Sequence, residues 1–391
     1  MSNLTDVTRI DFDYIIAGGG MAGLSLVFYL NDSEILRGKK ILVVDRDAKT
    51  ANDHTWCFWE KEKSAFEKIV FRRWKTLWFH GTRRFSKLLE AGEYEYKMIR
   101  AADFYKFIFD KIKANPNIEF LQADIQKIEN ETIETDKGNF TAKEFIFDSA
   151  TRKSYDNPQY KNLWQHFLGW QIETETEAFN PDEATLFDFR VEQKNECRFF
   201  YILPFSPKKA LIELTIFSDN ISEQNEYKAD LKKYIVETLK IENYKILETE
   251  RGIIPMSDEP HTEFPAAKII RIGTAGGYVK PSTGFSFQRT QRRLQKLVKD
   301  LEYSTLEIQN PKSKIQNWKH YLDSVLLDVL QTKKHPADEV FTLLFARNET
   351  PQVLKFLDEE TSVREDLRIM RTVPLAPFVK AALQVAAKKL K

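Results

Sequence analysis

The chain contains few cysteines and few histidines. Only Cys57 and Cys197 carry a thiol among its 391 residues, too few for a disulfide framework or a four-cysteine zinc site. The six histidines show no ligand spacing, so we expect no bound metal. The cysteine content makes a reducing, cytoplasmic location the expectation.

Long apolar runs and an excess of one charge are also absent. No stretch reaches the ~20 consecutive apolar residues of a membrane-spanning helix, and the polar run from Met1 to Asp11 is unlike a signal peptide. Lys and Arg total 59 against 58 Asp and Glu, and the resulting net charge of +1 would not attract nucleic acid. We therefore expect neither a spanning segment nor a nucleic-acid partner.

The first fifty residues predict a strand, a helix and a second strand. Residues 12–17 and 40–44 are apolar runs of strand length, and residues 21–30 have a helical pattern. This order predicts two parallel strands joined by a helical crossover. A helix at 103–114, a strand at 118–122 and an apolar strand at 144–148 are expected to follow.

The pattern changes in the middle of the chain. Between about 164 and 254, alternating runs such as 198–203 and 210–216 predict antiparallel strands, interrupted by one helix at 227–239. A short buried strand at 268–273 follows, and the chain after Ser286 has a mostly helical pattern.

The loop after the first strand has the spacing of a dinucleotide-binding turn. Gly18, Gly20 and Gly23 form G-x-G-x-x-G, with Met21 and Ala22 between the last two. These glycines serve a tight turn, the approach of backbone to a pyrophosphate, and close packing of helix on strand. The helix N-terminus then offers free N–H groups to the phosphates. An unrelated glycine-rich turn is the alternative.

An acidic residue ends the second strand. Asp45 follows Gly23 by 22 residues, close to the ~20 expected of the carboxylate that binds ribose hydroxyls. Arg46 would permit a 2′-phosphate, whereas Asp45 favours an unphosphorylated ribose. Both residues belong to the predicted cofactor site.

A second glycine-rich loop bears on the choice between NAD and FAD. The strand at 268–273 leads into a loop whose predicted cofactor contacts are Gly273, Gly277, Thr283, Gly284 and Phe285. This order resembles flavoproteins of the aromatic-hydroxylase type, in which such a loop touches the ribityl chain and pyrimidine edge of FAD. The resemblance implies FAD, although Thr274 stands where that class has Asp. A plain loop before a helix is the alternative.

We therefore predict an α/β fold of the aromatic-hydroxylase-like flavoprotein class. Its Rossmann-type FAD-binding domain is expected to be discontinuous, an antiparallel-sheet region is expected to bind substrate, and the C-terminal region is expected to be helical. The predicted ranges are 1–50, 98–160 and 255–300 for the FAD-binding domain, 51–97 and 161–254 for the sheet region, and 301–391 for the helical region.

Several motifs together are more specific than the glycines. They are Gly18 to Gly23, Asp53-His54-Thr55-Trp56, residues 98–105 around Arg100, Tyr201 to Phe205 with Leu211 to Thr215, and Gly273 to Ser286. Together they resemble the flavin-dependent lycopene cyclase family of carotenoid biosynthesis. Two positions depart from the family pattern: Leu214 replaces a second acid after Glu213, and the turn after Asp148 lacks glycine.

The resemblance implies a lycopene β-cyclase, an isomerase of the intramolecular lyase type. Such an enzyme converts the linear ψ end groups of lycopene to β-ionone rings, giving β-carotene via γ-carotene, with reduced FAD and no net redox change. NAD(P)H is the implied source of electrons. The resemblance also implies Glu213, His54 and Asp53 as catalytic residues, Arg100 and Asp148 as cofactor contacts, and Trp56, Trp59, Phe200 and Tyr201 as substrate contacts.

The chemistry requires a proton donor for a terminal alkene. A carboxylic acid in an apolar pocket has a raised pKa and can act as that acid, and Glu213 lies among Leu and Ile residues. Strand alternation alone favours another interpretation, in which Ile212 and Leu214 face inward and Glu213 faces solvent. The family resemblance favours the catalytic role.

The sequence also permits two other functions, and its C-terminal segment has two interpretations. A flavin monooxygenase or prenyl-chain reductase would share the fold, and a carotenoid-binding flavoprotein would share the site without catalysis. Because lycopene is a membrane lipid, we expect peripheral membrane association, with Lys380 to Lys391 as a candidate contact. An amphipathic helix packed on the protein body is the alternative for that segment.

Overall fold

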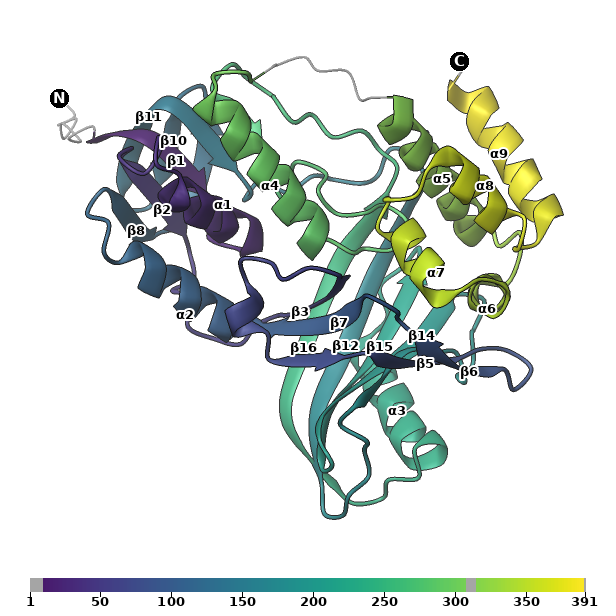
Figure 1. Cartoon of the computed structure of the whole chain (residues 1–391). Helices are drawn as coiled ribbons and strands as arrows, with labels where there is room; N and C mark the ends of the chain where they lie inside the picture. Colours follow the sequence, from purple (N-terminus) through teal and green to yellow (C-terminus); the bar gives the residue numbers. More distant parts are fainter. Residues whose placement is uncertain (1–9, 307–313, 390–391) are drawn as a thin grey trace.

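The computed structural model describes residues 10–306 and 314–389, arranged in three sheets with nine described α-helices around them (Figure 1). Most of the polar run from Met1 to Asp11 and the last two residues lie outside this range.

The first sheet is a seven-stranded, mostly parallel sheet near the N-terminus. Its order is β8-β2-β1-β11-β10-β9, and β17 also pairs with β11. The parallel strands are β1 (Ile10–Ala17), β2 (Ile41–Asp45), β8 (Ile118–Gln122), β11 (Gly138–Asp148) and β17 (Ile269–Arg271), and the antiparallel ones are β9 (Ile125–Glu129) and β10 (Thr132–Thr135).

Three helices pack together on this sheet. α1 (Met21–Asp32) contacts both α2 (Ala101–Ile112) and α4 (Phe287–Glu302), and their apolar side chains share one core with Ile16, Val43 and Phe147 of the strands. The sequence from β1 through α1 to β2 therefore forms the predicted parallel pair with its crossover. β11 is longer than the predicted strand at 144–148, because its first residues form a hairpin with β10.

The second sheet has seven strands in the order β16-β12-β15-β14-β13-β5-β6. Its strands are antiparallel except for the pair β13 and β5. The bounds are β5 (Thr76–His80), β6 (Ser86–Glu90), β12 (Asn162–Thr174), β13 (Glu183–Asp188), β14 (Cys197–Ser206), β15 (Lys209–Ser218) and β16 (Tyr244–Ser257).

Both faces of the second sheet are covered around β14 and β15. Ile212 and Leu214 pack on one face, with α3 (Gln224–Lys233) and the π-helical turn Tyr234–Thr238 that continues it. Leu211 and Phe217 face the opposite core. The C-terminal helices α5 (Lys314–Gln331), α6 (Ala337–Arg347), α7 (Thr350–Leu357), α8 (Val363–Met370) and α9 (Leu375–Lys389) contribute to that opposite core.

A small third sheet lies between the two large cores. It has the order β3-β7-β4, with β3 (Thr55–Glu60), β4 (Arg72–Trp74) and β7 (Glu95–Arg100), and the 3-10 turn Glu67–Ile69 lies between β3 and β4. Phe58 and Ile99 pack with the helices of the first sheet, while Trp59 and Met98 pack with the core of the second. Strand alternation therefore connects the two regions through this sheet. We keep the predicted domain boundaries as a proposal, supported by the way β5 and β6 join the strands of residues 161–254.

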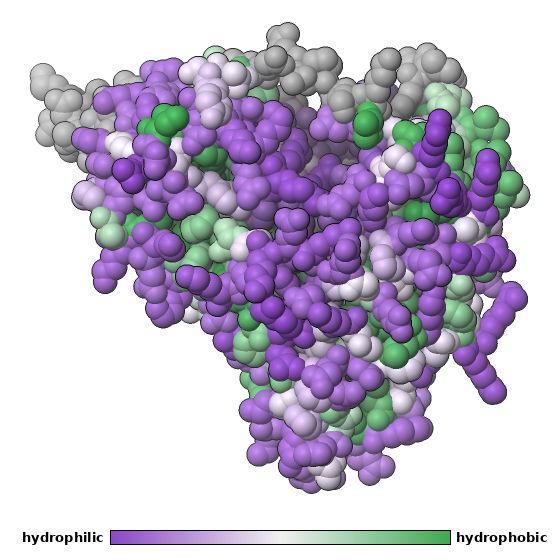
Figure 2. All heavy atoms as spheres, in the orientation of Figure 1, coloured by the Kyte–Doolittle hydropathy of each residue, from purple (hydrophilic) through white to green (hydrophobic). Residues whose placement is uncertain are grey.

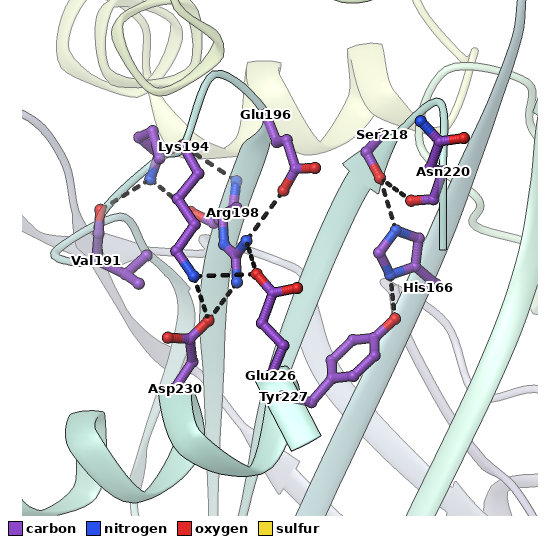
Figure 3. Close-up of polar contacts among 11 residues, drawn as sticks. His166, Val191, Lys194, Glu196, Arg198, Ser218, Asn220, Glu226, Tyr227 and Asp230 are labelled. Atoms are coloured by element: carbon purple, nitrogen blue, oxygen red, sulfur yellow. Dashed lines mark hydrogen bonds and ion pairs between the residues drawn. The ribbon is translucent and has the colours of Figure 1, made fainter. Parts of the chain in front are cut away.

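Buried polar groups hold α3 against the second sheet (Figure 3). The guanidinium of Arg198 on β14 pairs with Glu196, Glu226 and Asp230. Nearby, the ring of His166 hydrogen-bonds Ser218 at 2.7 Å and also Tyr227. Burial lowers the pKa of His166 to about 4, so the imidazole is neutral at pH 7.

Candidate active site

The dinucleotide loop is tightly folded where β1 meets α1. A Cβ atom on Gly23 would lie 1.9 Å from the carbonyl oxygen of Gly18, so only glycine lets the helix pack this closely on the loop. Gly18 itself has a positive φ of 102°. Ser149, at the end of β11, donates hydrogen bonds to the carbonyls of Ala17 and Gly18 and fixes the turn from the other side.

The middle glycine has open space in front of it. Gly20 is the N-cap of α1, and a Cβ atom on it would meet no atom within 4 Å. Met21 and Ala22 begin the helix behind it, where unpaired backbone N–H groups face outward. This loop can therefore accept an anionic group against the helix N-terminus.

Asp45 lies beside the same loop. Its Oδ2 accepts a hydrogen bond of 2.7 Å from the backbone N–H of Gly19, and the Lys49 ammonium lies 3.3 Å from its Oδ1. Arg46 follows at the end of β2 and is exposed. The carboxylate thus stands next to the predicted pyrophosphate loop, as a ribose-binding acid requires.

The late glycine-rich loop lies against the first one. Gly273 has a positive φ of 59°, and a Cβ atom there would lie 2.8 Å from Cβ of Ala22. Gly277 likewise has a positive φ, of 71°, and approaches His261. The two glycine-rich segments, about 250 residues apart in sequence, therefore lie in contact in the fold.

Further along, the late loop approaches the second sheet and leaves polar atoms without partners. A Cβ atom on Gly284 would lie 2.0 Å from Oε1 of Gln165 on β12. That oxygen and Oγ1 of Thr283 are both buried and have no hydrogen-bond partner among the described residues. Phe285 packs edge-on against Trp59, with ring centroids 4.7 Å apart. Buried polar atoms without hydrogen-bond partners need a polar neighbour. Their position beside Gly284, where the loop backbone comes close to β12, fits a polar ring system such as a flavin.

Arg100 and Asp148 are engaged by neighbouring groups. Nε of Arg100 donates to Asp103 at 2.7 Å, and its guanidinium lies 3.9 Å from the ring centre of Phe71. Asp148 accepts the backbone N–H groups of Ala150 and Thr151, at 3.1 and 2.9 Å. Asp148 thus fixes the turn that follows β11 through residues 149–151, and direct cofactor contact by Arg100 or Asp148 stays a prediction.

Glu213 is half-buried on the second sheet. It projects from β15 on the face that also carries Leu211 and Phe217, and Oγ1 of Thr215 donates to its carboxyl at 2.8 Å. The other face, with Ile212 and Leu214, is covered as well, so strand alternation alone does not decide which face of β15 meets solvent. An acid at position 214 would face α3, away from Glu213.

A second glutamate meets Glu213 from another strand. Glu250 on β16 approaches Glu213 across Gly169, where a Cβ atom would lie 3.3 Å from Cγ of Glu250 and 3.4 Å from Cβ of Glu213. Burial and the adjacent Glu250 charge raise the pKa of Glu213 well above its usual range. Burial also raises the pKa of Glu250, and hydrogen bonds from Thr55 and Glu213 oppose that rise. Burial and the adjacent Glu250 thus favour the protonated form of Glu213, next to a second carboxyl.

The His54-Thr55-Trp56 motif contacts this pair through its threonine. Oγ1 of Thr55 donates a hydrogen bond to Glu250. His54 is about half exposed and lies 3.2 Å from Asp53. Burial alone would raise the pKa of Asp53, but hydrogen bonds from His54 and Tyr105 lower it. These hydrogen bonds favour the ionised form of Asp53, and the catalytic roles of Asp53 and His54 stay predictions.

The predicted substrate contacts divide between faces. Tyr201 pairs with Glu213 across β14 and β15, and Trp59 packs with Tyr96 in the same core. Phe200 points to the opposite face, where its ring stacks on Tyr234 at 3.7 Å. Trp56 also points away, and its ring lies edge-on to Phe104 of α2. The structure therefore groups only Trp59 and Tyr201 with the acid.

Glu250 and Gly169 were missed by the sequence prediction, and Thr55 was seen only as part of a motif. Glu250 lies 37 residues after Glu213, and no local pattern links the two. The only signal is its position in Glu248-Thr249-Glu250, where a strand alternates acids on one face. Among the described residues, no group of three or more His, Cys, Asp or Glu side chains could hold a metal ion.

Comparison with solved structures identifies the fold. A flavoprotein/dehydrogenase from Cytophaga hutchinsonii aligns with 97% of this chain and 100% of its own, with a TM-score of 0.64 and 12% identity. A geranylgeranyl bacteriochlorophyll reductase-like protein from Thermoplasma acidophilum covers 96% and 100%, with a TM-score of 0.61 and 14% identity. The flavin-dependent brominase Bmp2, as a triple mutant, gives a TM-score of 0.61 at 12% identity and covers 96% and 100%. The fold is that of flavin-dependent proteins.

Sequence comparison identifies the family. The capsanthin/capsorubin synthase of Capsicum annuum is 25% identical over 312 residues, 73% of this chain and 59% of that protein. The lycopene beta-cyclase of Pantoea ananas is 23% identical over 287 residues, 70% of this chain and 71% of that protein. The chain thus matches between about three fifths and seven tenths of these curated relatives. A family model described as lycopene cyclase protein matches residues 13–383, and the chain belongs to this family.

Proposed function

We propose that the chain is a flavin-dependent lycopene β-cyclase that turns linear ψ end groups into β-ionone rings without net redox change. The observation that carries the proposal is the half-buried carboxyl of Glu213, whose pKa burial and Glu250 raise well above its usual range, on the same sheet face as Gln165. Gln165 contacts Gly284 of the predicted flavin loop and lies four residues before Gly169, the β12 partner of Glu213. At about 3.3 Å per residue, that spacing is about 13 Å.

Glu213 would start the reaction by giving its proton to the terminal alkene. The O–H bond of the acid breaks, a C–H bond forms, and the resulting tertiary cation is attacked by a second double bond of the substrate. Loss of a proton from the adjacent ring carbon then completes the β ring. Trp59 and Tyr201 present apolar and aromatic surface on this side of the sheet, which excludes water and favours a cation.

The two glycine-rich loops would hold the cofactor. Gly18, Gly20 and Gly23 fit a pyrophosphate and Asp45 a ribose, while Thr283 and Gln165 offer unpaired polar atoms to the flavin ring. A reduced FAD bound there, with NAD(P)H as the electron source, would supply an electron-rich surface beside the cation.

Pigment analysis tests the proposed function. Expression of the chain in a bacterium that accumulates lycopene is expected to give a cyclic carotenoid with the mass of lycopene, because cyclisation conserves all atoms. A product heavier by oxygen would indicate a monooxygenase, and one heavier by hydrogen a reductase. Recovery of unchanged lycopene bound to the protein would indicate a carotenoid carrier. The empty vector and a lysine-to-alanine change at exposed Lys127 are the controls.

We also propose peripheral membrane association through α9. The helix buries Phe378, Ala381 and Val385 in the protein core, as expected for an amphipathic helix packed on the body. It nevertheless exposes Leu375, Val379 and Leu383, whose relative accessibilities are 61%, 46% and 67%. Figure 2 shows apolar residues gathered on the same side of the molecule as α9 in Figure 1. None of the described helices is long and apolar enough to cross a membrane.

A double substitution tests this surface. Val379→Glu with Leu383→Glu is expected to weaken binding to vesicles containing anionic lipid by about tenfold or more, because two exposed apolar side chains leave the interface. Co-sedimentation with vesicles measures the effect. Gln384→Glu, exposed on the same helix, adds charge without removing an apolar group and is the matched control. Equal binding by all three proteins would place the membrane contact elsewhere.

A further inference from the structure

We propose that Glu250 is a positioning residue that shares one proton with Glu213 across Gly169 and thereby keeps Glu213 in its acidic form. The inference rests on the proposed function for its role in cyclisation. The pairing of the two carboxyls is a separate claim with a test of its own.

Strand register brings the two glutamates to the same place. β12 lies between β15 and β16, and Gly169 is the register partner of Glu213 on one side and of Glu250 on the other. Residues in register project to the same face of a sheet. Strands two apart are separated by about 9.6 Å, so these carboxyls meet only by reaching across the middle strand.

Gly169 leaves the space in which they meet. A Cβ atom on Gly169 would lie 3.3 Å from Cγ of Glu250 and 3.4 Å from Cβ of Glu213. Any larger side chain would stand between the two carboxyls. Glycine in the interior of a strand lowers stability and often marks a place where other groups approach closely. Here the groups are the side chains of Glu213 and Glu250.

A hydrogen bond between the two carboxyls requires a proton, because two carboxylates offer only acceptors. Thr55 donates to Glu250 and Thr215 donates to Glu213, and neither glutamate has an ion-pair partner among the described residues. The other titratable groups that act on the pair come from four strands and the residue before β3: His54, Cys57, Tyr96, Tyr201 and Glu248. Among them only His54 could bring a positive charge, and it lies about half exposed.

This arrangement assigns different states to the two carboxyls. The Thr55 hydroxyl and the proton of Glu213 both favour the negative charge on Glu250, and that charge in turn holds the proton on Glu213. When Glu213 gives its proton to the alkene, its O–H bond breaks and a C–H bond forms. The proton lost later from the ring carbon can return to the pair, so each turnover leaves the pair as it began.

The pH dependence of turnover separates positioning from a purely structural role. Glu250→Gln removes the neighbouring negative charge, so Glu213 should lose its proton more readily. In the flavin-loaded protein, the alkaline limb of the rate profile is expected to move to lower pH by about one unit or more. A uniform loss of rate at every pH, with the limb unmoved, would overturn the proposal. Glu173→Gln, on β12 and paired with Lys209 near the surface, is the matched control and should leave the limb in place.

Infrared spectroscopy tests the pair without relying on catalysis. The stretching band of a protonated carboxyl should persist in the wild-type protein to a higher pH than in Glu250→Gln, and it should be absent at neutral pH in Glu213→Gln. Gly169→Ala separates the carboxyls while retaining both, and its band should shift in the same direction as that of Glu250→Gln. Identical titration in the wild type and Glu250→Gln would overturn the pairing. The expected band shift without any cyclisation would instead contradict only the proposed function.

Discussion

Glu213→Gln is expected to lower the rate of lycopene cyclisation by at least 10²- to 10⁴-fold, the usual contribution of a positioned general acid. Glutamine matches glutamic acid in shape and can still hydrogen-bond Glu250, but its amide proton is not acidic enough to protonate an alkene. The buried face of β15 should therefore keep its packing and lose its chemistry. Turnover is measured by chromatography of the pigments formed by the flavin-loaded protein.

The control for this variant is its flavin content. Glu213 lies on the second sheet, whereas the predicted pyrophosphate loop lies on the first, so flavin absorbance per protein should equal that of the wild type. Glu213→Asp keeps an acidic proton on a shorter side chain and should retain part of the activity. Full activity of Glu213→Gln would eliminate Glu213 as the proton donor.

Local patterns predicted the unit formed by β1, α1 and β2, which the structure confirms. The apolar strand, the glycine spacing and the acid at Asp45 are all contained within residues 12–45, and each follows from requirements of a single turn. The structure places Asp45 against Gly19 as that motif demands. It also places the late loop against Ala22, a contact that no local pattern specifies.

The second sheet shows where local reasoning failed. Alternation predicts an exposed Glu213 because it assumes that one sheet face meets solvent, and here helices cover both faces. Glu213 is half-buried there, and its catalytic role, which the family resemblance favours, stays a prediction. Alternation would in turn have corrected the grouping of Phe200 with Tyr201, since adjacent strand residues project to opposite faces, as the structure confirms.

Glu250 was beyond reach of the sequence for a different reason. Its partnership with Glu213 depends on β12 lying between β15 and β16 and on a register that places Gly169 beside both acids. A shift of one residue would turn either glutamate to the other face. Strand order and register are properties of the whole sheet. Next to Glu213 the sequence offers Leu214 and no second acid, so no local pattern points to Glu250.

Gly23→Ala is expected to lower the affinity for FAD by 100-fold or more. The added methyl group would lie 1.9 Å from the carbonyl oxygen of Gly18, closer than any non-bonded contact allows. The helix must therefore move away from the loop, and the phosphate site is lost with it. Overpacking of this kind also costs about 1–3 kcal/mol of folding free energy, so the melting temperature of the flavin-free protein should fall.

Gly20→Ala separates cofactor binding from folding at the same loop. A methyl group on Gly20 meets no protein atom within 4 Å, and the backbone φ of −75° suits alanine, so the flavin-free protein should melt as the wild type does. If the pyrophosphate lies against this glycine, the methyl group occupies its space and FAD affinity falls by about tenfold or more, equal to about 1.4 kcal/mol. Fluorescence titration with FAD measures the affinity of each variant.

Gly38→Ala completes the comparison. Gly38 is exposed, and a Cβ atom there also meets nothing within 4 Å, but it lies in the turn before β2 and not in the predicted cofactor loop. It should change neither melting nor affinity. If Gly20→Ala behaves like Gly38→Ala, the cofactor does not approach the middle glycine. If Gly20→Ala lowers FAD affinity without changing the melting temperature, the open space before α1 is the pyrophosphate site. Gly20 then leaves room for the cofactor, whereas Gly23 leaves room for the helix to pack on the loop.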